Sequence, residues 1–347
     1  MSAITFSDVL FEPQYSEVMS RSSVDLSSDM GKFKLSLPVI SANMKDVTGP
    51  KMCHAMYRAG GVGILHRFRN PQDSNDPYGV NLLRNTFDQF SEEEPAMTYD
   101  EIAKHVGVSI GVKEDDKHRF YELFEAGARI FCIDVAQGHH ILVKNMIKWI
   151  RIRNHLNVTI IAGNVATIQG AKDLREWGAD IIKVGIGPGE ACQTRKNTGV
   201  GVPQLSAIRD IRQAIPDIVM ISDGGIKTTG DIAKAMKYAN AVMIGSFIAG
   251  ASETPGNVYE SPDGQFYKVF GGSASGERKV ENGGKHAFVE GVVKMVPFRG
   301  HVRYLLKKIK ENLQSSFSYS GANNLKEFQE KSVLIEISGG ARLESKI

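Results

Sequence analysis

The chain has 347 residues, 42% of them hydrophobic, which is enough to bury a large core in one large domain or two smaller ones. Its 42 Lys and Arg residues are nearly balanced by 39 Asp and Glu residues spread along the chain, so no basic stripe favours nucleic acid as a partner. No apolar window approaches the roughly 18 residues of a membrane span, and the N-terminus lacks the pattern of a signal peptide. We therefore expect a cytoplasmic protein with no membrane attachment.

Eight short apolar runs, rich in Val and Ile and polar only at their C-terminal ends, recur along the chain. They cover residues 37–42, 61–66, 106–111, 130–134, 158–163, 181–185, 218–223 and 241–245. Runs of this length and composition are typical of parallel strands that are buried on both faces.

Segments with helical spacing lie between these runs. They include residues 117–126, 138–152, 168–177, 204–214 and 229–238. Several end in a short step such as Gly127-Ala128 or Gly178-Ala179, which is typical of a helix C-cap. Eight strand–helix pairs fit a closed barrel better than an open doubly wound sheet, although the count alone leaves both open. We predict a single α/β domain over residues 1–347, built as a (β/α)8 TIM barrel.

Two stretches interrupt the alternation. Residues 70–98 are polar and acidic and are expected to form a surface excursion after the second strand. Residues 251–300 are Gly-rich and charged and follow the eighth strand, where either an active-site lid or a disordered loop would fit. The C-terminal segment, residues 301–347, begins with an amphipathic helix predicted over residues 302–310.

In a barrel of this kind the active site lies at the C-terminal ends of the strands. The polar or glycine-rich groups that follow the predicted strands are Asn43, His66, Arg67, Asp134, Asn164, residues 187–192, Asp223, Gly245 and Ser246. Any one of these could simply cap a helix or a turn. Their convergence on one end of the barrel is the stronger signal.

The loop after the sixth strand is the most informative. Its glycines permit backbone torsions that turn amides and carbonyls toward a ligand. Of the three cysteines, Cys53, Cys132 and Cys192, none forms a Cys-x-x-Cys pair, which argues against a disulfide framework or structural zinc. Cys192 lies beside Thr194, Arg195 and Lys196, and positive neighbours favour a thiolate. A lone cysteine is often inert, but this one is a candidate nucleophile.

Glycines also follow the seventh and eighth strands. Ser222-Asp223-Gly224-Gly225 and Gly245-Ser246 stand where barrels commonly bind phosphate, and an adjacent carboxylate can accept two ribose hydroxyls. The residues therefore predict a phosphorylated ribose as ligand.

Together these motifs resemble the inosine monophosphate dehydrogenase and GMP reductase superfamily, and within it the shorter bacterial GMP reductases. The resemblance covers nearly the whole chain and is most specific in the cysteine loop. It is carried by residues 42–44 (ANM), 63–68 (GILHRF), 133–139 (IDVAQGH), 160–167 (IIAGNVAT), 183–201 (KVGIGPGEACQTRKNTGVG), 221–235 (ISDGGIKTTGDIAKA) and 242–250 (VMIGSFIAG).

The resemblance implies that Cys192 attacks C2 of a purine nucleotide and forms a thioimidate. In a reductase the 2-amino group leaves as ammonia and a hydride from NADPH gives IMP, a step of purine nucleotide salvage. In a dehydrogenase a hydride leaves to NAD and water releases XMP. The short lid, the absence of its Arg-Tyr pair and the short stretch after the second strand favour the reductase, in which Thr194 pairs with Glu290 for proton transfer. An IMP dehydrogenase and a catalytically altered purine-nucleotide-binding barrel remain the alternatives.

The same resemblance implies roles for further residues, a monovalent cation (normally potassium) and a homotetramer. The implied substrate-binding residues are Asn43, Met44, Arg67, Asp223, Gly224, Gly225, Gly245, Ser246 and Ser273. The implied NADPH-binding residues are Ser109, Gly111, Asp134, Ala136, Gly138 and Asn164, and the implied cation ligands are the carbonyls of Gly187, Gly189 and Cys192.

Four residues depart from the family pattern. Glu190 replaces a serine that often binds phosphate, and its charge would repel a phosphate if it pointed inward. Phe270 replaces a tyrosine of some relatives, Gly272 a base-contacting methionine, and Arg67 a lysine. These changes leave the cysteine chemistry intact and point to an altered nucleotide specificity or a divergent paralogue.

Overall fold

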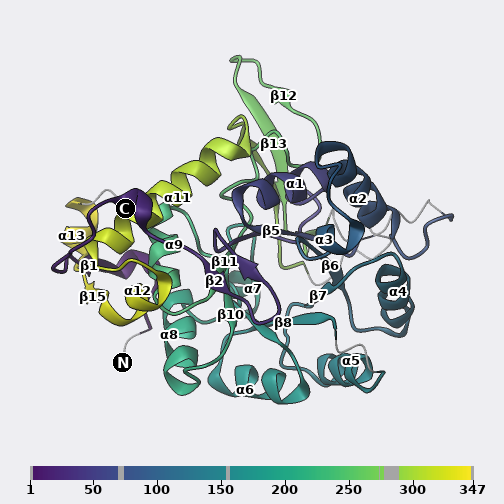
Figure 1. Ribbon diagram of the computed structural model, residues 1–347, viewed down its shortest axis with the longest axis horizontal. Coiled ribbons are helices and arrows are strands. Elements are labelled where there is room, and N and C mark those ends of the chain that lie inside the picture. Colours follow the sequence, from purple (N-terminus) through teal and green to yellow (C-terminus); the bar gives the residue numbers. More distant parts are fainter. Residues whose placement is uncertain (1–2, 69–73, 154–156, 273, 277–288, 345–347) are drawn as a thin grey trace.

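The computed structural model describes residues 3–68, 74–153, 157–272, 274–276 and 289–344. Eight parallel strands form a closed barrel in the order β10-β11-β4-β5-β6-β7-β8-β9 (Figure 1). They are β4 (Val39–Ser41), β5 (Val62–Leu65), β6 (Val106–Ile110), β7 (Ile130–Asp134), β8 (Thr159–Val165), β9 (Ile181–Val184), β10 (Met220–Asp223) and β11 (Ala241–Ile244). Because β11 pairs with β4, the sheet has no free edge, and the predicted TIM barrel is confirmed over the open sheet.

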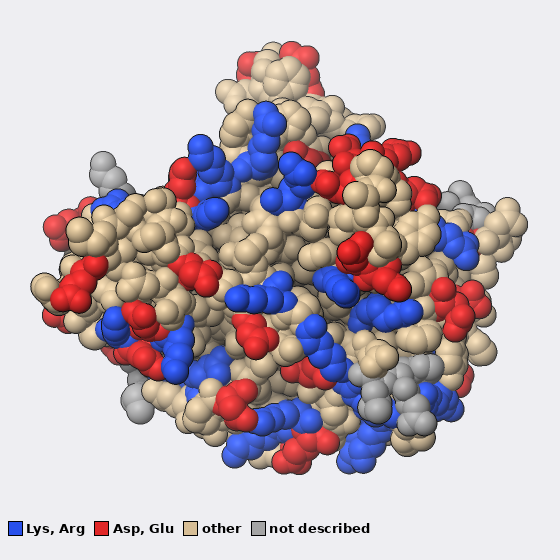
Figure 2. Space-filling view, viewed as in Figure 1, with Lys and Arg blue, Asp and Glu red and all other residues tan. Residues whose placement is uncertain are grey.

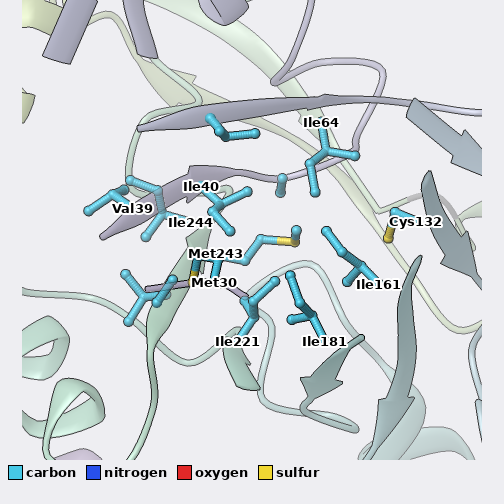
Figure 3. Close-up of a cluster of buried hydrophobic side chains, with 14 of the residues drawn as sticks. Met30, Val39, Ile40, Ile64, Cys132, Ile161, Ile181, Ile221, Met243 and Ile244 are labelled. Atoms are coloured by element: carbon cyan, nitrogen blue, oxygen red, sulfur yellow. The ribbon is translucent and has the colours of Figure 1, made fainter. Parts of the chain in front are cut away.

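Aliphatic and sulfur-containing side chains fill the inside of the barrel. Figure 3 shows Ile40, Ile161, Ile221 and Met243 pointing toward one another from different strands, and all four are at most 1% exposed. Met30, from the turn between β2 (Ser28–Asp29) and β3 (Lys34–Leu35), is fully buried in the same cluster. The barrel is therefore a packed core, and the chemistry is confined to its rim.

Helices surround the barrel (Figure 1). They are α1 (Pro50–Ala59), α4 (Glu114–Glu125), α5 (Ile141–Ile152), α6 (Ile168–Trp177), α8 (Gln204–Ala214) and α9 (Thr229–Met236). Helix α4 begins three residues before the predicted start, because Asp116 in its first turn accepts the amides of Gly111 and Lys113. Helix α5 begins at Ile141 and not at Gly138, because the Gly138 amide is drawn to the Asn164 carbonyl, 2.7 Å away.

The polar stretch after the second barrel strand is more structured than the sequence indicated. It contains α2 (Asn81–Glu93), which packs on α1, and α3 (Tyr99–Ile102) follows it. Leu83, Phe87 and Phe90 are buried on one face of α2. The predicted surface excursion thus contains a helix, because apolar residues spaced three and four apart stabilise it within an otherwise acidic segment.

The segment after β11 forms a small antiparallel sheet. Its strands are β12 (Tyr259–Glu260), β13 (Phe266–Gly271) and β14 (Val293–Pro297), and Figure 1 shows β12 and β13 projecting beyond the ring of helices. The middle of the predicted lid, residues 277–288, lies outside the described residues. Strand β14 begins beside the cysteine loop, where the Val292 amide that precedes it donates to the Ala191 carbonyl.

The C-terminal segment ties the two ends of the chain together. Helix α11 (Val302–Tyr319) extends beyond the predicted end at residue 310, since Leu313 and Phe317 continue its buried face. After α12 (Leu325–Lys331), β15 (Val333–Glu336) pairs antiparallel with β1 (Val9–Glu12), and α13 (Gly339–Glu344) follows. Two short 3-10 helices, η1 (Phe6–Asp8) and η2 (Arg21–Ser23), complete the N-terminal segment.

Acidic and basic side chains are interspersed over the face shown in Figure 2. Among the described residues, no helix combines the length and apolarity needed to cross a bilayer.

Candidate active site

Cys192 is the one cysteine of the three that is not buried. Burial raises the pKa of the Cys53 thiol, and burial raises the pKa of Cys132 to about 12, so both are held as inert thiols in the core. Cys192 lies in the loop between β9 and the short helix α7 (Thr194–Thr198). Gly187, with φ of +87°, shapes this loop, since a Cβ there would lie 2.5 Å from Arg195 Cγ.

A hydrogen-bonded relay links Cys192 to residues 289–292, the end of the predicted lid, which we call the lid segment. The Cys192 thiol donates to Thr194 Oγ1 at 3.2 Å, and the Thr194 hydroxyl donates to Glu290 Oε2 at 2.7 Å. The three residues come from two segments separated by almost a hundred positions in the chain. A thiol, a hydroxyl and a carboxylate in series can carry a proton away from sulfur and return it.

Backbone pairing holds Glu290 in this relay. The Gln193 amide donates to the Glu290 carbonyl at 2.7 Å, and the Val292 amide donates to the Ala191 carbonyl at 3.1 Å. The Asn197 side-chain amide donates to the Val289 carbonyl at 2.8 Å. The lid segment thus adds a short strand-like pairing to the cysteine loop, which fixes the carboxylate beside Thr194.

A buried lysine lies behind the predicted ribose-binding carboxylate. Lys183 Nζ, in a side chain that is 3% exposed, donates to Asp223 Oδ2 at 2.9 Å and to Asn164 Oδ1 at 2.6 Å. Asn164 Nδ2 also donates to Asp223 Oδ2, at 2.8 Å. Burial by itself lowers the pKa of Lys183, but the nearby Asp223 and Asp134 carboxylates outweigh it, so the pKa lies above its usual value.

This cluster fixes the orientation of Asp223. Its Oδ2 is saturated by Lys183 and Asn164, while Oδ1 accepts no hydrogen bond from the described residues. Oδ1 is therefore the oxygen available to a ligand hydroxyl. Sequence reasoning missed Lys183, and the available signal was a single charged residue inside the apolar run of residues 181–185.

The predicted phosphate-binding glycines converge beside the cysteine loop. Gly224 and Gly225 have φ of +91° and +80°, and a Cβ on Gly224 would lie 3.1 Å from the Gly189 amide nitrogen. A Cβ on Gly245 would lie 3.2 Å from Met44 Sδ. The structure thus brings together the loops after β9, β10 and β11, with Met44 against them; Asn43 next to Met44 is buried.

Glu190 lies in the cysteine loop, and its side chain is 45% exposed. Its carboxylate is paired with Lys294 of β14. Partial burial raises the pKa of Glu190, but the bonds from Lys294 and Ser246, together with the charges of Lys294 and Lys227, bring it below the usual value. The carboxylate is therefore ionised at neutral pH.

The residues assigned to NADPH divide into two groups. Asp134 Oδ2 pairs with Arg67 Nε at 3.3 Å, which joins a predicted cofactor residue to a predicted substrate residue, and Ala136 is exposed beside them. Ser109 is fully buried within β6, Gly111 is held by Asp116, and Asn164 is committed to Asp223 and the Gly185 carbonyl. The first group is accessible to a ligand, whereas the residues of the second group are buried or hydrogen-bonded to other parts of the protein and support the rim.

Close backbone approach explains why position 138 is a glycine, since a Cβ there would lie 2.7 Å from the Gly163 carbonyl carbon.

The predicted cation ligands lie in the cysteine loop, where the Gly189 carbonyl accepts the Cys192 amide at 3.0 Å. A carbonyl has a second lone pair, so this bond is compatible with cation binding. In the part of the chain that the structure describes, no cluster of three or more His, Cys, Asp or Glu residues could hold a metal. Ser273 lies outside the described residues.

Comparison with known proteins agrees with this arrangement. The family described as "IMP dehydrogenase / GMP reductase domain" matches residues 3–347. A GMP reductase from Streptococcus equi subsp. equi is 37% identical over 339 residues, covering 96% of this chain and 95% of that protein. A GMP reductase from Lactobacillus delbrueckii subsp. bulgaricus is 36% identical over 330 residues, covering 94% and 92%.

A dehydrogenase and a solved structure are also similar. An inosine-5′-monophosphate dehydrogenase from Nitrosopumilus maritimus is 30% identical over 466 aligned positions, covering 99% of this chain and 97% of that protein. The crystal structure of a GMP reductase from Trypanosoma brucei in complex with guanosine 5′-monophosphate superposes with a TM-score of 0.87 at 27% identity, covering 99% and 97%. The chain therefore belongs to the IMP dehydrogenase / GMP reductase family of NAD(P)-dependent oxidoreductases that act on purine nucleotides.

Proposed function

We propose that this protein is a GMP reductase, which converts GMP to IMP and ammonia with NADPH as hydride donor in purine nucleotide salvage. The observation that carries the proposal is the relay from Cys192 through Thr194 to Glu290. A reductive deamination needs a nucleophile for C2 and a proton for the departing amine, and these three groups supply both.

The relay accounts for the protons and electrons of the first step. The thiol proton passes through Thr194 to the Glu290 carboxylate, and the Cys192 thiolate attacks C2 of guanine. The carbon–sulfur bond forms as the carbon–nitrogen bond breaks, and the amino group takes the returning proton from Glu290 through Thr194 and leaves as ammonia. One thiol proton is thus transferred to one amine, which balances the step.

NADPH, when bound, supplies the hydride that replaces sulfur at C2. The electron pair of the carbon–sulfur bond then returns to Cys192. We assign Asp134 and Ala136 to the nicotinamide side of the site and Arg67, which pairs with Asp134, to the substrate side, because they are accessible at the ends of β7 and β5. Potassium would bind the carbonyls of Gly187, Gly189 and Cys192 and would support the cysteine loop.

An IMP dehydrogenase is the second candidate, favoured by the Nitrosopumilus relative. Their alignment spans 466 positions, which exceeds the 347 residues of this chain, so the dehydrogenase has segments without a counterpart here. The two reductase alignments, over 330 and 339 residues, are no longer than this chain. This difference supports the reductase.

Anaerobic incubation with GMP and NADPH in potassium buffer tests the proposal directly. We expect loss of reduced cofactor together with equal amounts of ammonia and IMP. A parallel reaction with IMP and NAD tests the dehydrogenase by XMP formation. Cofactor oxidation without ammonia, or XMP formation alone, would contradict the proposed reductase.

Variants of the relay test the assigned roles. We expect Cys192→Ala to abolish turnover, and Thr194→Ala and Glu290→Gln to lower kcat by about a hundredfold or more while nucleotide binding is kept. Thr194→Ser retains a hydroxyl and should restore most of the rate. An active Cys192→Ala protein would rule out the covalent mechanism.

We also propose a homotetramer, on the family resemblance alone. Light scattering of the purified protein would measure its mass, and a monomer would contradict this assignment.

A further inference from the structure

Lys294 is a basic side chain beside the predicted phosphate-binding glycines. It belongs to β14, and its ammonium pairs with the carboxylate of Glu190 in the cysteine loop. The Lys294 side chain is 33% exposed. The cysteine loop therefore holds the ammonium in place and leaves it accessible to a ligand.

The pairing with Glu190 brings Lys294 to one side of the glycine cradle. Glu190 directly follows Gly189 in the chain. Gly189 in turn lies against the loop after β10, since a Cβ on Gly224 would be 3.1 Å from the Gly189 amide nitrogen. Lys294 is thus connected to the two loops that follow β9 and β10.

A second contact brings Lys294 to the loop after β11. Lys294 is paired in register with Phe270 of β13, and its ammonium lies 5.9 Å from the centre of the Phe270 ring. Phe270 is 2% exposed, and its Cε2 would lie 3.9 Å from a Cβ on Gly245. One aromatic ring therefore lies between the Lys294 ammonium and the glycine that follows β11.

The chemistry of this position suits a phosphate. The cradle glycines offer backbone amides but no charge, whereas a nucleotide 5′-phosphate is an acceptor-only anion that a nearby ammonium stabilises. An ammonium has several N–H donors, and one of them donates to Glu190 Oε1, which leaves donors for a second acceptor. Lys227 adds another positive charge near Glu190, so the three side chains together are positive.

We propose that Lys294 binds the 5′-phosphate of the purine nucleotide and so makes the protein distinguish a nucleotide from its nucleoside. The inference rests on the proposed function, in which GMP is the substrate, and adds a residue for the phosphate end of that substrate. Glu190 orients the ammonium, and the chemistry at C2 stays with Cys192.

Calorimetric titration with GMP and with guanosine tests the contact independently of turnover. Lys294→Met keeps the length of the side chain and removes its charge. It should raise the dissociation constant for GMP by about tenfold or more and leave that for guanosine unchanged. IMP carries the same 5′-phosphate and should lose affinity equally. An equal loss for guanosine and GMP, or no loss for GMP, would overturn the proposal.

A comparison in the Glu190→Gln background separates a phosphate contact from simple neutralisation of Glu190. Without Lys294 the Glu190 carboxylate is left to repel a phosphate, and Glu190→Gln removes that repulsion. We expect the double variant Glu190→Gln/Lys294→Met to bind GMP about tenfold more weakly than Glu190→Gln alone. Equal affinities of these two variants would show that Lys294 only neutralises Glu190, which would overturn the contact.

Lys308→Met provides the matched control, because Lys308 is exposed on α11 and its loss changes the net charge by the same amount. It should leave both dissociation constants unchanged. A loss of GMP affinity as large as in Lys294→Met would assign the effect to net charge and contradict the contact. The melting temperature of each variant reports whether it is folded.

These results distinguish the inference from the proposed function. Reduction of GMP by the wild type together with unchanged GMP binding in Lys294→Met would keep the reductase and remove the role of Lys294. Binding of GMP that depends on Lys294, without release of ammonia, would keep the role of Lys294 and remove the reductase. Absence of GMP binding by the wild type would contradict both.

Discussion

Lys183 shows how one buried residue can organise a site. Its ammonium joins Asp223 and Asn164, which come from two other barrel strands. A charged lysine in a barrel core is stable only because a carboxylate neutralises it and because its hydrogen bonds are satisfied. We therefore regard Lys183 as a positioning residue for Asp223.

Replacing Lys183 with Met should remove one of the two donors to Asp223 Oδ2 and take from Asn164 Oδ1 the ammonium that donates to it. We expect the free energy of unfolding to fall by about 2 kcal/mol and KM for the purine substrate to rise, because the ribose acceptor loses its fixed orientation. Urea unfolding and steady-state kinetics measure the two effects. Lys172→Met, at an exposed position of α6, is the control and should change neither. A rise in KM of equal size in both variants would exclude the positioning role.

His66, at the end of β5, should make stability depend on pH. Burial, with smaller contributions from Arg119 and Lys45, lowers its pKa from 6.5 to about 4, and its Nδ1 is buried with no hydrogen-bond partner among the described residues. Between these two pKa values the unfolded chain binds a proton at His66 and the folded protein does not. The contribution of neutral His66 to the free energy of unfolding is therefore complete above pH 6.5 and is lost as the pH falls toward 4. Between pH 7 and 5 the wild type should lose about 2 kcal/mol more than His66→Asn, as measured by urea unfolding. Equal losses would show that His66 does not titrate in this way.

At the scale of elements, the lid segment and the cysteine loop depend on close backbone approach. Gly291 lies between them: a Cβ there would be 2.9 Å from the Ser275 amide nitrogen and 3.4 Å from the Ala191 carbonyl oxygen. A side chain would push the lid segment away and separate Glu290 from Thr194.

We expect Gly291→Val to lower kcat by about tenfold to a hundredfold, because the relay loses its geometry while the barrel is unaffected. Stopped-flow or steady-state assays measure kcat, and circular dichroism checks the fold. Gly339→Ala is the control, since no atom lies within 4 Å of a Cβ at that position. Full activity of Gly291→Val would show that Glu290 does not need this pairing.

At the scale of the whole molecule, the two chain ends pack into one unit with the barrel. The fully buried Phe328 of α12 stacks on Phe317 of α11, with ring centres 4.1 Å apart, and meets Phe11 of β1 edge-on at 5.2 Å. The N-terminal strand, the long C-terminal helix and α12 therefore share one aromatic cluster beside the barrel.

Truncating Phe328 to Ala should lower the free energy of unfolding by about 4 kcal/mol, through lost burial and the cavity left behind. Chemical denaturation followed by fluorescence and by circular dichroism would measure it, and the two probes should agree if ends and barrel unfold together. Leu343→Ala, at a position that is 82% exposed, should have little effect. A separate early transition in the wild type would show that the ends unfold independently.

Much of the site could be predicted from local sequence because its groups follow strand ends. Cys192 and Asp223 each follow a Val- and Ile-rich run, and the strand-end rule places both at one rim. The hydrogen-bond and ion-pair partners of the site residues could not be predicted in this way. Lys183 lies within a predicted strand, where the sequence gives no sign of its partners. The partner of Glu190 is Lys294, which lies 104 positions further along the chain.

By itself the sequence determined the eight buried strands, the helices between them and the presence of a nucleophile candidate in a glycine-rich loop, because hydrophobic period and glycine placement act over a few residues. Only the tertiary structure decided the helix α2 within an acidic stretch, the pairing of β1 with β15, the Lys183–Asp223–Asn164 cluster and the pairing of Glu190 with Lys294. These features depend on contacts between segments that are distant in sequence and come together when the barrel closes, and local hydrophobic periodicity carries no information about such contacts.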